Sequence, residues 1–142
     1  KKNKVAVVCG ILSGTLASLT GIFVLCMLFG FNHQQYVTML PKSITTAIGI
    51  GISEELGGIV TITVAVIIIT GILGNVIADT VFHIFKIKNP LAKGLALGTA
   101  SHAIGTARAI EMGPVEGAMS SLAVAVAGLL TVVFVSGFAQ LI

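Results

Sequence analysis

Charged residues are scarce in this chain of 142 residues. Acidic and basic side chains make up 9% of it, whereas 56% of the residues are hydrophobic and the mean hydropathy is +1.09. A soluble domain usually carries about 25% charged residues, with which it covers its surface. The composition therefore excludes a soluble fold and predicts an all-α integral membrane protein, with a single transmembrane domain over residues 1–142.

Other residues and patterns that would indicate chemistry are also missing or rare. Tryptophan is absent, and the two cysteines, Cys9 and Cys26, lie too far apart along one apolar run to form a disulfide. No metal-ligand spacing appears, so we expect no metal and no cofactor. No nucleophile is paired with a base, so we expect no enzyme activity. The lysines form no basic face, which argues against a nucleic-acid partner.

Three uncharged runs have the length of membrane spans. Residues 5–31 and 117–142 exceed the roughly 20 residues that a helix needs to cross the hydrocarbon core, and residues 59–78 match that length. In the first run, small residues recur at four-residue spacing, which is typical of close helix packing. These small residues are Gly10, Gly14 and Ser18.

The segments between the runs suggest connections at the membrane surface. We expect residues 32–40 to be a polar connection. Residues 79–89 alternate apolar and polar residues, which predicts a short interfacial helix that Pro90 ends. On that helix Asp79 and His83 are four residues apart and could pair.

Two polar, glycine-rich segments interrupt the apolar pattern, at residues 41–58 and 97–116. Ionisable groups are expensive at membrane depth and tend to mark function there. Glycine-interrupted hydrophobic segments are also typical of transporter binding sites. We therefore expect the substrate to contact polar residues of these two segments. The candidates are Ser43, Thr45, Thr46, Thr99, Ser101, His102, Thr106 and Arg108.

The two polar segments resemble each other. When Thr46 is aligned with His102, at an offset of 56, both copies read AIG, then five residues, then Glu, Leu or Met, and Gly. Chance matching is the alternative, since the chain is rich in small and apolar residues. The match predicts an internal repeat of the kind that transporters contain, with halves at residues 41–78 and 91–142.

The lysines bear on the orientation of these copies. If residues 41–58 cross the membrane, Lys86, Lys88 and Lys93 lie opposite the N-terminal lysines; if they form a re-entrant hairpin, all lie on one side. The positive-inside rule favours the hairpin. The copies would then be re-entrant or discontinuous helices in an inverted repeat, with a site near the midplane. We expect the hairpin ends to be shaped by Glu55, Gly57, Glu111, Gly113 and Pro114.

Three stretches of the chain closely resemble the LrgB/CidB family: PKSITTAIGIGISEELGGI, TGILG and NPLAKGLALGTASHAIGTARAIEMGPVEGAMSSLA. The resemblance covers essentially the whole chain. Because family members are longer and have further spans before it, we expect a C-terminal portion. The resemblance implies one of two functions. Bacterial members are antiholin-like regulators of murein hydrolase activity and lysis, whereas others, similar to the C-terminal part of the plastid glycolate/glycerate translocator, carry small monocarboxylates such as glycolate, glycerate or pyruvate.

The broken, matched repeat favours the carrier, with an antiholin-like lysis regulator as the alternative. Arg108 could hold a carboxylate with two hydrogen bonds, or be occupied by Glu111 or Glu116. His102 could donate to the substrate or carry a proton, or be a satisfied buried histidine. We expect a multi-pass protein of the plasma membrane. Its expected partners are a small carboxylate, membrane lipids, further copies of itself and an LrgA/CidA-like membrane subunit.

Overall fold

The computed structural model describes residues 3–142, and these residues form six α-helices. Three helices, at Lys4–Phe29, Val60–Ile84 and Pro114–Ala139, are long and apolar enough to cross a membrane. The expected all-helical architecture with three long apolar helices is confirmed. The helices are α1 (Asn3–Phe29), α2 (His33–Met39), α3 (Thr46–Glu55), α4 (Val60–Ile84), α5 (Pro90–Met112) and α6 (Pro114–Ala139).

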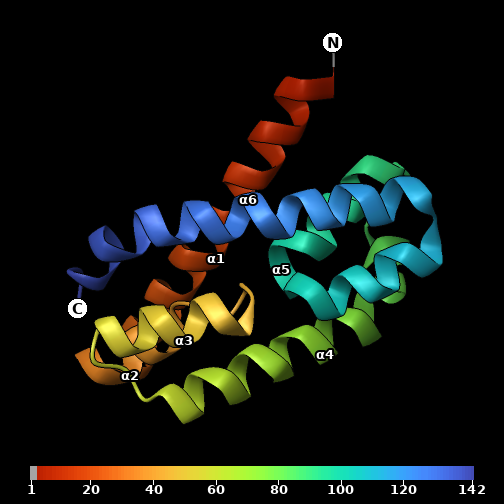
Figure 1. The fold of residues 1–142 in the computed structure, drawn as a ribbon. Helices are drawn as coiled ribbons and strands as arrows, with labels where there is room; N and C mark the ends of the chain where they lie inside the picture. Colours follow the sequence, from red (N-terminus) through yellow and green to blue (C-terminus); the bar gives the residue numbers. More distant parts are fainter. Residues whose placement is uncertain (1–2) are drawn as a thin grey trace.

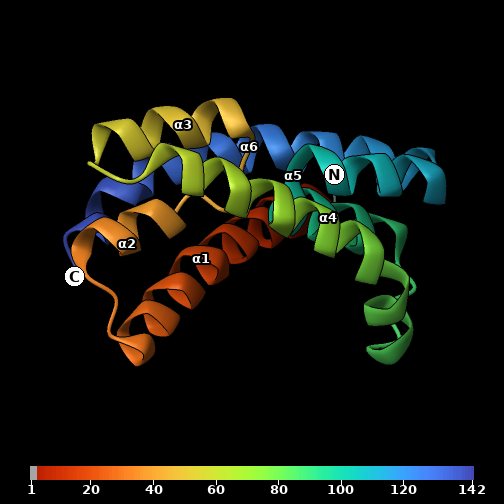
Figure 2. The same cartoon turned by 90° about the horizontal axis from the view of Figure 1, so that it is seen from below.

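The long helices α4 and α6 run in opposite directions along the molecule (Figures 1 and 2). The short helices α2 and α3 lie at the end where α4 begins and α6 finishes, whereas α5 lies towards the other end. Helix α1 crosses this arrangement and packs on both α5 and α6. The most extensive packing joins α5 to α6, which follow each other through the single residue Gly113.

The expectation of a polar connection at residues 32–40 is wrong, because most of that stretch is α2. The Asn32 side chain accepts a hydrogen bond from the Gln35 amide at 2.9 Å, and the Gln35 side chain accepts one from the Asn32 amide at 3.0 Å. This reciprocal pair is a capping box, which satisfies amides left free at a helix start. Tyr36 then anchors α2 by donating to the carbonyl of Phe138 at 2.8 Å.

The expected interfacial helix at residues 79–89 is also wrong, because α4 continues without a break to Ile84. The chain turns at Lys86, whose φ is +54°. Pro90 begins α5 rather than ending a helix, and Asn89 caps that start by accepting from the amide of Leu91 at 2.9 Å. Proline suits the first turn of a helix, because a backbone N–H at that position has no partner within the helix and proline lacks this N–H. Pro114 occupies the same place in α6, as expected.

Glycines let the helices approach closely. A Cβ atom at Gly98 of α5 would collide with the backbone oxygen of Ser120 in α6. In α1, a Cβ atom at Gly14 would lie 2.7 Å from Oγ1 of Thr99. The small-residue stripe expected for α1 is therefore a packing surface for α5.

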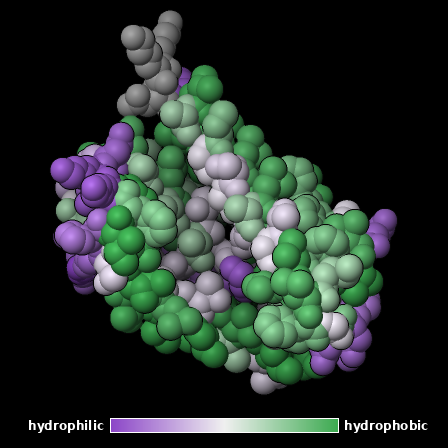
Figure 3. All heavy atoms as spheres, turned by 180° about the vertical axis from the view of Figure 1, so that it is seen from behind, coloured by the Kyte–Doolittle hydropathy of each residue, from purple (hydrophilic) through white to green (hydrophobic). Residues whose placement is uncertain are grey.

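The outer surface is apolar, as a membrane-embedded chain requires. Figure 3 shows hydrophobic residues over most of one face and hydrophilic residues gathered mainly at two opposite edges. The most exposed large hydrophobic side chains of the long helices include Val76, at 71%, and Val133, at 71%. Exposing such a surface to water is unfavourable, whereas lipid tails solvate it.

Candidate functional site

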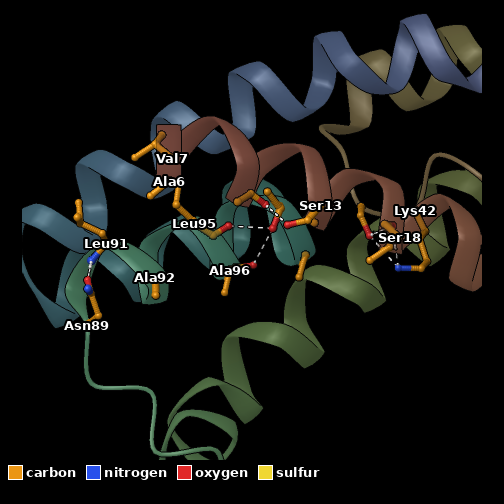
Figure 4. Close-up of a pocket in the computed structure, with 16 residues that line it drawn as sticks. Ala6, Val7, Ser13, Ser18, Lys42, Asn89, Leu91, Ala92, Leu95 and Ala96 are labelled. Carbon is orange, nitrogen blue, oxygen red and sulfur yellow. Dashed lines mark hydrogen bonds between the residues drawn. The ribbon is translucent and has the colours of Figure 1, made fainter. Parts of the chain in front are cut away.

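A groove of about 780 Å³ runs between α1 and the first half of α5. Figure 4 shows Asn89 at one end of this groove and Lys42 at the other. Small residues of α1 form one wall, because only small side chains leave space between helices that lie this close. The lining residues are Ala6, Val7, Gly10, Ser13, Gly14, Ala17, Ser18, Lys42, Ser43, Asn89, Leu91, Ala92, Leu95, Ala96, Thr99 and Ala100.

Lys42 closes the inner end of the groove. It lies in the segment between α2 and α3, and its ammonium donates to Oγ of Ser43 at 2.8 Å and to Oγ of Ser18 at 3.4 Å. Ser18 itself donates to Ser43 at 2.9 Å, which ties this segment to the middle of α1. Within residues 3–142, no carboxylate forms an ion pair with Lys42.

Hydroxyl groups gather near the same end. Thr99 of α5 lines the groove and donates to the carbonyl of Leu95 at 2.8 Å. Behind it lies a cavity of about 10 Å³, roughly the space of one water molecule. Thr15 lines this cavity, is only 3% exposed, and has no hydrogen-bond partner for its hydroxyl. The cavity and the groove share Ser18, Ser43 and Thr99.

The backbone of α5 is broken at His102, which divides the helix into two halves. Its φ of +43° and ψ of −136° are not helical, and a non-glycine residue adopts them only under strain. The side chain is 3% exposed, and its Nε2 atom lies 2.9 Å from the carbonyl of Ile67 in α4. The ring packs against Gly71, where a Cβ atom would lie 2.8 Å from it. His102 is thus a bonded buried histidine and does not line the groove.

Arg108 also lies away from the groove. Its guanidinium donates to Asp79 and, at 2.6 Å, to Glu111. The expected pair with Glu111 is therefore present, and Asp79 pairs with Arg108 rather than with His83. The contact with Asp79 ties the second half of α5 to α4, whereas the contact with Glu111 lies within α5. In this conformation the charge of Arg108 is therefore paired with two carboxylates of the chain itself.

The other expected substrate contacts are distributed over several surroundings. Ser43 and Thr99 line the groove, whereas Thr45 and Thr46 start α3, and the Thr45 side chain does not cap that helix. Ser101 is 2% exposed and packs against Gly74. Two further hydroxyls meet between α5 and α6, where Oγ1 of Thr106 lies 2.8 Å from Oγ of Ser120. The structure thus brings two of the eight candidates into the groove.

The expected hairpin ends lie at helix boundaries. Glu55 is the last residue of α3, and Gly57 follows with a φ of +74°, a conformation that glycine adopts without strain. Glu111 is near the end of α5, Gly113 joins α5 to α6, and Pro114 starts α6.

Sequence reasoning missed Lys42, Ser18 and Thr15 as members of one site. A signal for Lys42 was available, because it is the only Lys, Arg, Asp or Glu between residues 5 and 53. Ser18 and Thr15 carried no such signal, since hydroxyl residues in an apolar helix usually bond to their own backbone.

Comparison with known proteins shows which family the chain resembles. The family model described as the LrgB-like family matches residues 1–141. The chain is 39% identical over 142 residues to the Antiholin-like protein LrgB of Bacillus subtilis (strain 168), covering 100% of this chain and 62% of that protein. It is 41% identical over 138 residues to proteins of the same name from Bacillus cereus (strain B4264) and Bacillus anthracis (strain CDC 684 / NRRL 3495), covering 97% of this chain and 60% of each.

The chain therefore spans about 60% of the length of these relatives. No solved structure is similar to it at a significant level. The family match and the identities confirm the resemblance seen in the sequence, and this chain belongs to the LrgB-like family.

Proposed function

We propose that the protein containing this chain is an antiholin-like protein of the plasma membrane, which restrains murein hydrolase activity and cell lysis. The observation that carries this proposal is the identity of about 40% over the whole chain to relatives named antiholin-like proteins. The three long apolar helices support a multi-pass membrane location. This function requires protein partners, which would be further copies of the chain or an LrgA/CidA-like membrane subunit.

A specific observation favours a second function, the transport of a small monocarboxylate. The groove leads to a lysine that lies near the middle of α1 and is bonded only to serine hydroxyls. A regulator that acts through protein contacts needs no such polar recess, whereas a carrier needs one near the midplane.

The helix boundaries support the inverted repeat that a carrier would use. Moving α3, Thr46–Glu55, by 56 residues gives positions 102–111, and the second half of α5 follows the break at His102 and ends at Met112. Moving α4, Val60–Ile84, gives positions 116–140, close to the bounds of α6. The proposed halves, at residues 41–78 and 91–142, therefore have helices at matching positions as well as a similar sequence.

The arrangement of the helices supports re-entrant hairpins. His33, at the start of α2, bonds to the carbonyl of Ile142, while the segment after α2 reaches Ser18 in the middle of α1. The chain then returns through α3 to the start of α4 (Figures 1 and 2). We propose that α2 and α3 enter from one membrane face, that α5 enters from the other, and that alternating access moves these hairpins against α1.

One experiment separates the two functions. The full-length protein is expressed in a strain that lacks its own copy, and lysis rate and murein hydrolase activity are measured. The purified protein is also placed in proteoliposomes, where uptake of radiolabelled glycolate and pyruvate is followed. Slower lysis in the complemented strain, with no specific uptake, supports the antiholin-like function alone. Saturable uptake supports the carrier, and unchanged lysis would contradict the antiholin-like function.

A further inference from the structure

We propose that Lys42 is the cation that binds the carboxylate of a small organic acid at the inner end of the groove. The inference rests on the proposed carrier function and names a ligand contact for it. Arg108, the cation that the sequence favoured for this task, is held by Asp79 and Glu111 outside the groove.

Within residues 3–142, no carboxylate neutralises the charge of Lys42. Its ammonium donates to the Ser43 and Ser18 hydroxyls, which solvate a charge but do not balance it. Within residues 3–142, the ion pairs between acidic and basic side chains are both formed by Arg108. An unpaired charge at membrane depth is costly and tends to face a ligand or a water-filled cavity. A bound carboxylate would supply the missing negative charge.

The depth of Lys42 argues for a soluble anion rather than a lipid headgroup. Its partner Ser18 lies about 22 Å along α1 from the start of that helix, at a rise of 1.5 Å per residue. The hydrocarbon core is about 30 Å thick. If α1 spans the hydrocarbon core, Lys42 would lie well below the level of the lipid phosphates, at the opposite end of the groove from Asn89 (Figure 4).

Thr15 provides a second polar group beside the inner end of the groove. Its hydroxyl is buried without a partner, and it faces the small cavity that meets the groove at Ser18, Ser43 and Thr99. That cavity, of about 10 Å³, has space for one oxygen atom of a ligand or one water. An oxygen atom of the ligand, or one water beside it, would supply the hydrogen-bond partner that the Thr15 hydroxyl lacks.

The test uses the full-length protein in proteoliposomes with radiolabelled glycolate as the probe. Lys42→Met removes the charge and keeps the length of the side chain, whereas Lys42→Arg keeps the charge. Lys88→Met is the matched control, since Lys88 is exposed at the opposite end of the groove region. We expect Lys42→Met to raise the KM for glycolate at least about tenfold, because the variant loses one charge-assisted hydrogen bond to the carboxylate. Lys42→Arg and Lys88→Met should retain uptake.

Thermal unfolding of the purified protein provides a second measurement. Without ligand, Lys42→Met should be at least as stable as the parent, because it removes an unpaired charge. Glycolate should raise the melting temperature of the parent but not that of Lys42→Met. Normal uptake by Lys42→Met would overturn the role of Lys42 and leave the carrier function standing, whereas absence of uptake by the parent would overturn both. Stabilisation by glycerol phosphate but not by glycolate would also overturn the proposal, in favour of a lipid headgroup.

Discussion

At the scale of single residues, two glycines show how packing decides the effect of one methyl group. A Cβ atom at Gly98 would collide with the Ser120 backbone oxygen and with Ala123 of α6. At Gly51 of α3 a Cβ atom would meet nothing within 4 Å. Alanine has a higher helix propensity than glycine, by up to about 1 kcal/mol. The same substitution should therefore have opposite effects at these two positions.

We expect Gly98→Ala to lower the free energy of unfolding by about 1–3 kcal/mol, because α5 and α6 must separate to accommodate the methyl group. Gly51→Ala is the matched control and should leave stability unchanged or slightly higher. Thermal or denaturant unfolding in detergent measures both. Equal stability of the two variants would show that α5 and α6 do not pack as closely as Gly98 indicates.

At the scale of elements, the decisive contact joins the segment between α2 and α3 to the middle of α1. The Oγ atoms of Ser18 and Ser43 lie 2.9 Å apart, although the residues are far apart in sequence. The contact joins residues 40–45 to the groove and holds Ser43 beside Lys42 at its end. Leu40 and Ile44 of the same segment pack in one core cluster with Leu19 of α1. Helix α5 reaches the same region from the other side, through Thr99.

A disulfide tests this placement. In a background without Cys9 and Cys26, the pair Ser18→Cys and Ser43→Cys should form a disulfide on mild oxidation, because its sulfur atoms would start close to bonding distance. Mass spectrometry of the digested protein detects the linked peptides. The pair Ser13→Cys and Ser43→Cys is the control, since Ser13 lies about 7.5 Å away from Ser18 along α1. Equal linkage of both pairs would contradict the placement.

At the scale of the whole molecule, the proposed hairpin gives the chain a definite topology. Lys86, Lys88 and Lys93 lie at the end of the molecule where α4 finishes and α5 begins, whereas Glu54 and Glu55 end α3 at the opposite end, where α4 begins. The positive-inside rule predicts that the lysine end faces the cytoplasm. Lys1 and Lys2, which entered the same sequence argument, lie outside the described residues.

Cysteine labelling tests the topology. Single cysteines at Asn32, Glu55 and Lys88, in a cysteine-free background, are treated with a membrane-impermeant maleimide in intact cells and in inverted vesicles. Asn32→Cys and Glu55→Cys should both react in intact cells, because the chain between them returns to its own side. Lys88→Cys should react in inverted vesicles and serves as the control for sidedness. Reaction of Asn32→Cys and Glu55→Cys from opposite sides would show that residues 33–54 cross the membrane.

Some features of this protein followed from local sequence alone. The scarcity of charge predicted a membrane protein, and the uncharged runs predicted the three long helices, because both depend only on the free energy of placing each residue in lipid. The end of the run at residues 59–78 was misplaced, since residues 79–84 continue α4 rather than start a new helix. The helix α2 was missed although its capping box, Asn32 with Gln35, was visible in the sequence.

The candidate site depended on contacts between residues far apart in the chain. Their ionisable side chains in a polar, glycine-rich segment singled out Arg108 and His102, but only the tertiary structure pairs Arg108 with Asp79 and bonds His102 to Ile67. It likewise brings Lys42 against Ser18 at the end of the groove. Composition and periodicity decide which segments enter the membrane, since that choice is made residue by residue. Packing decides which polar groups can still bind a ligand. Asp79 of α4 forms an ion pair with Arg108, whereas no carboxylate within residues 3–142 forms one with Lys42.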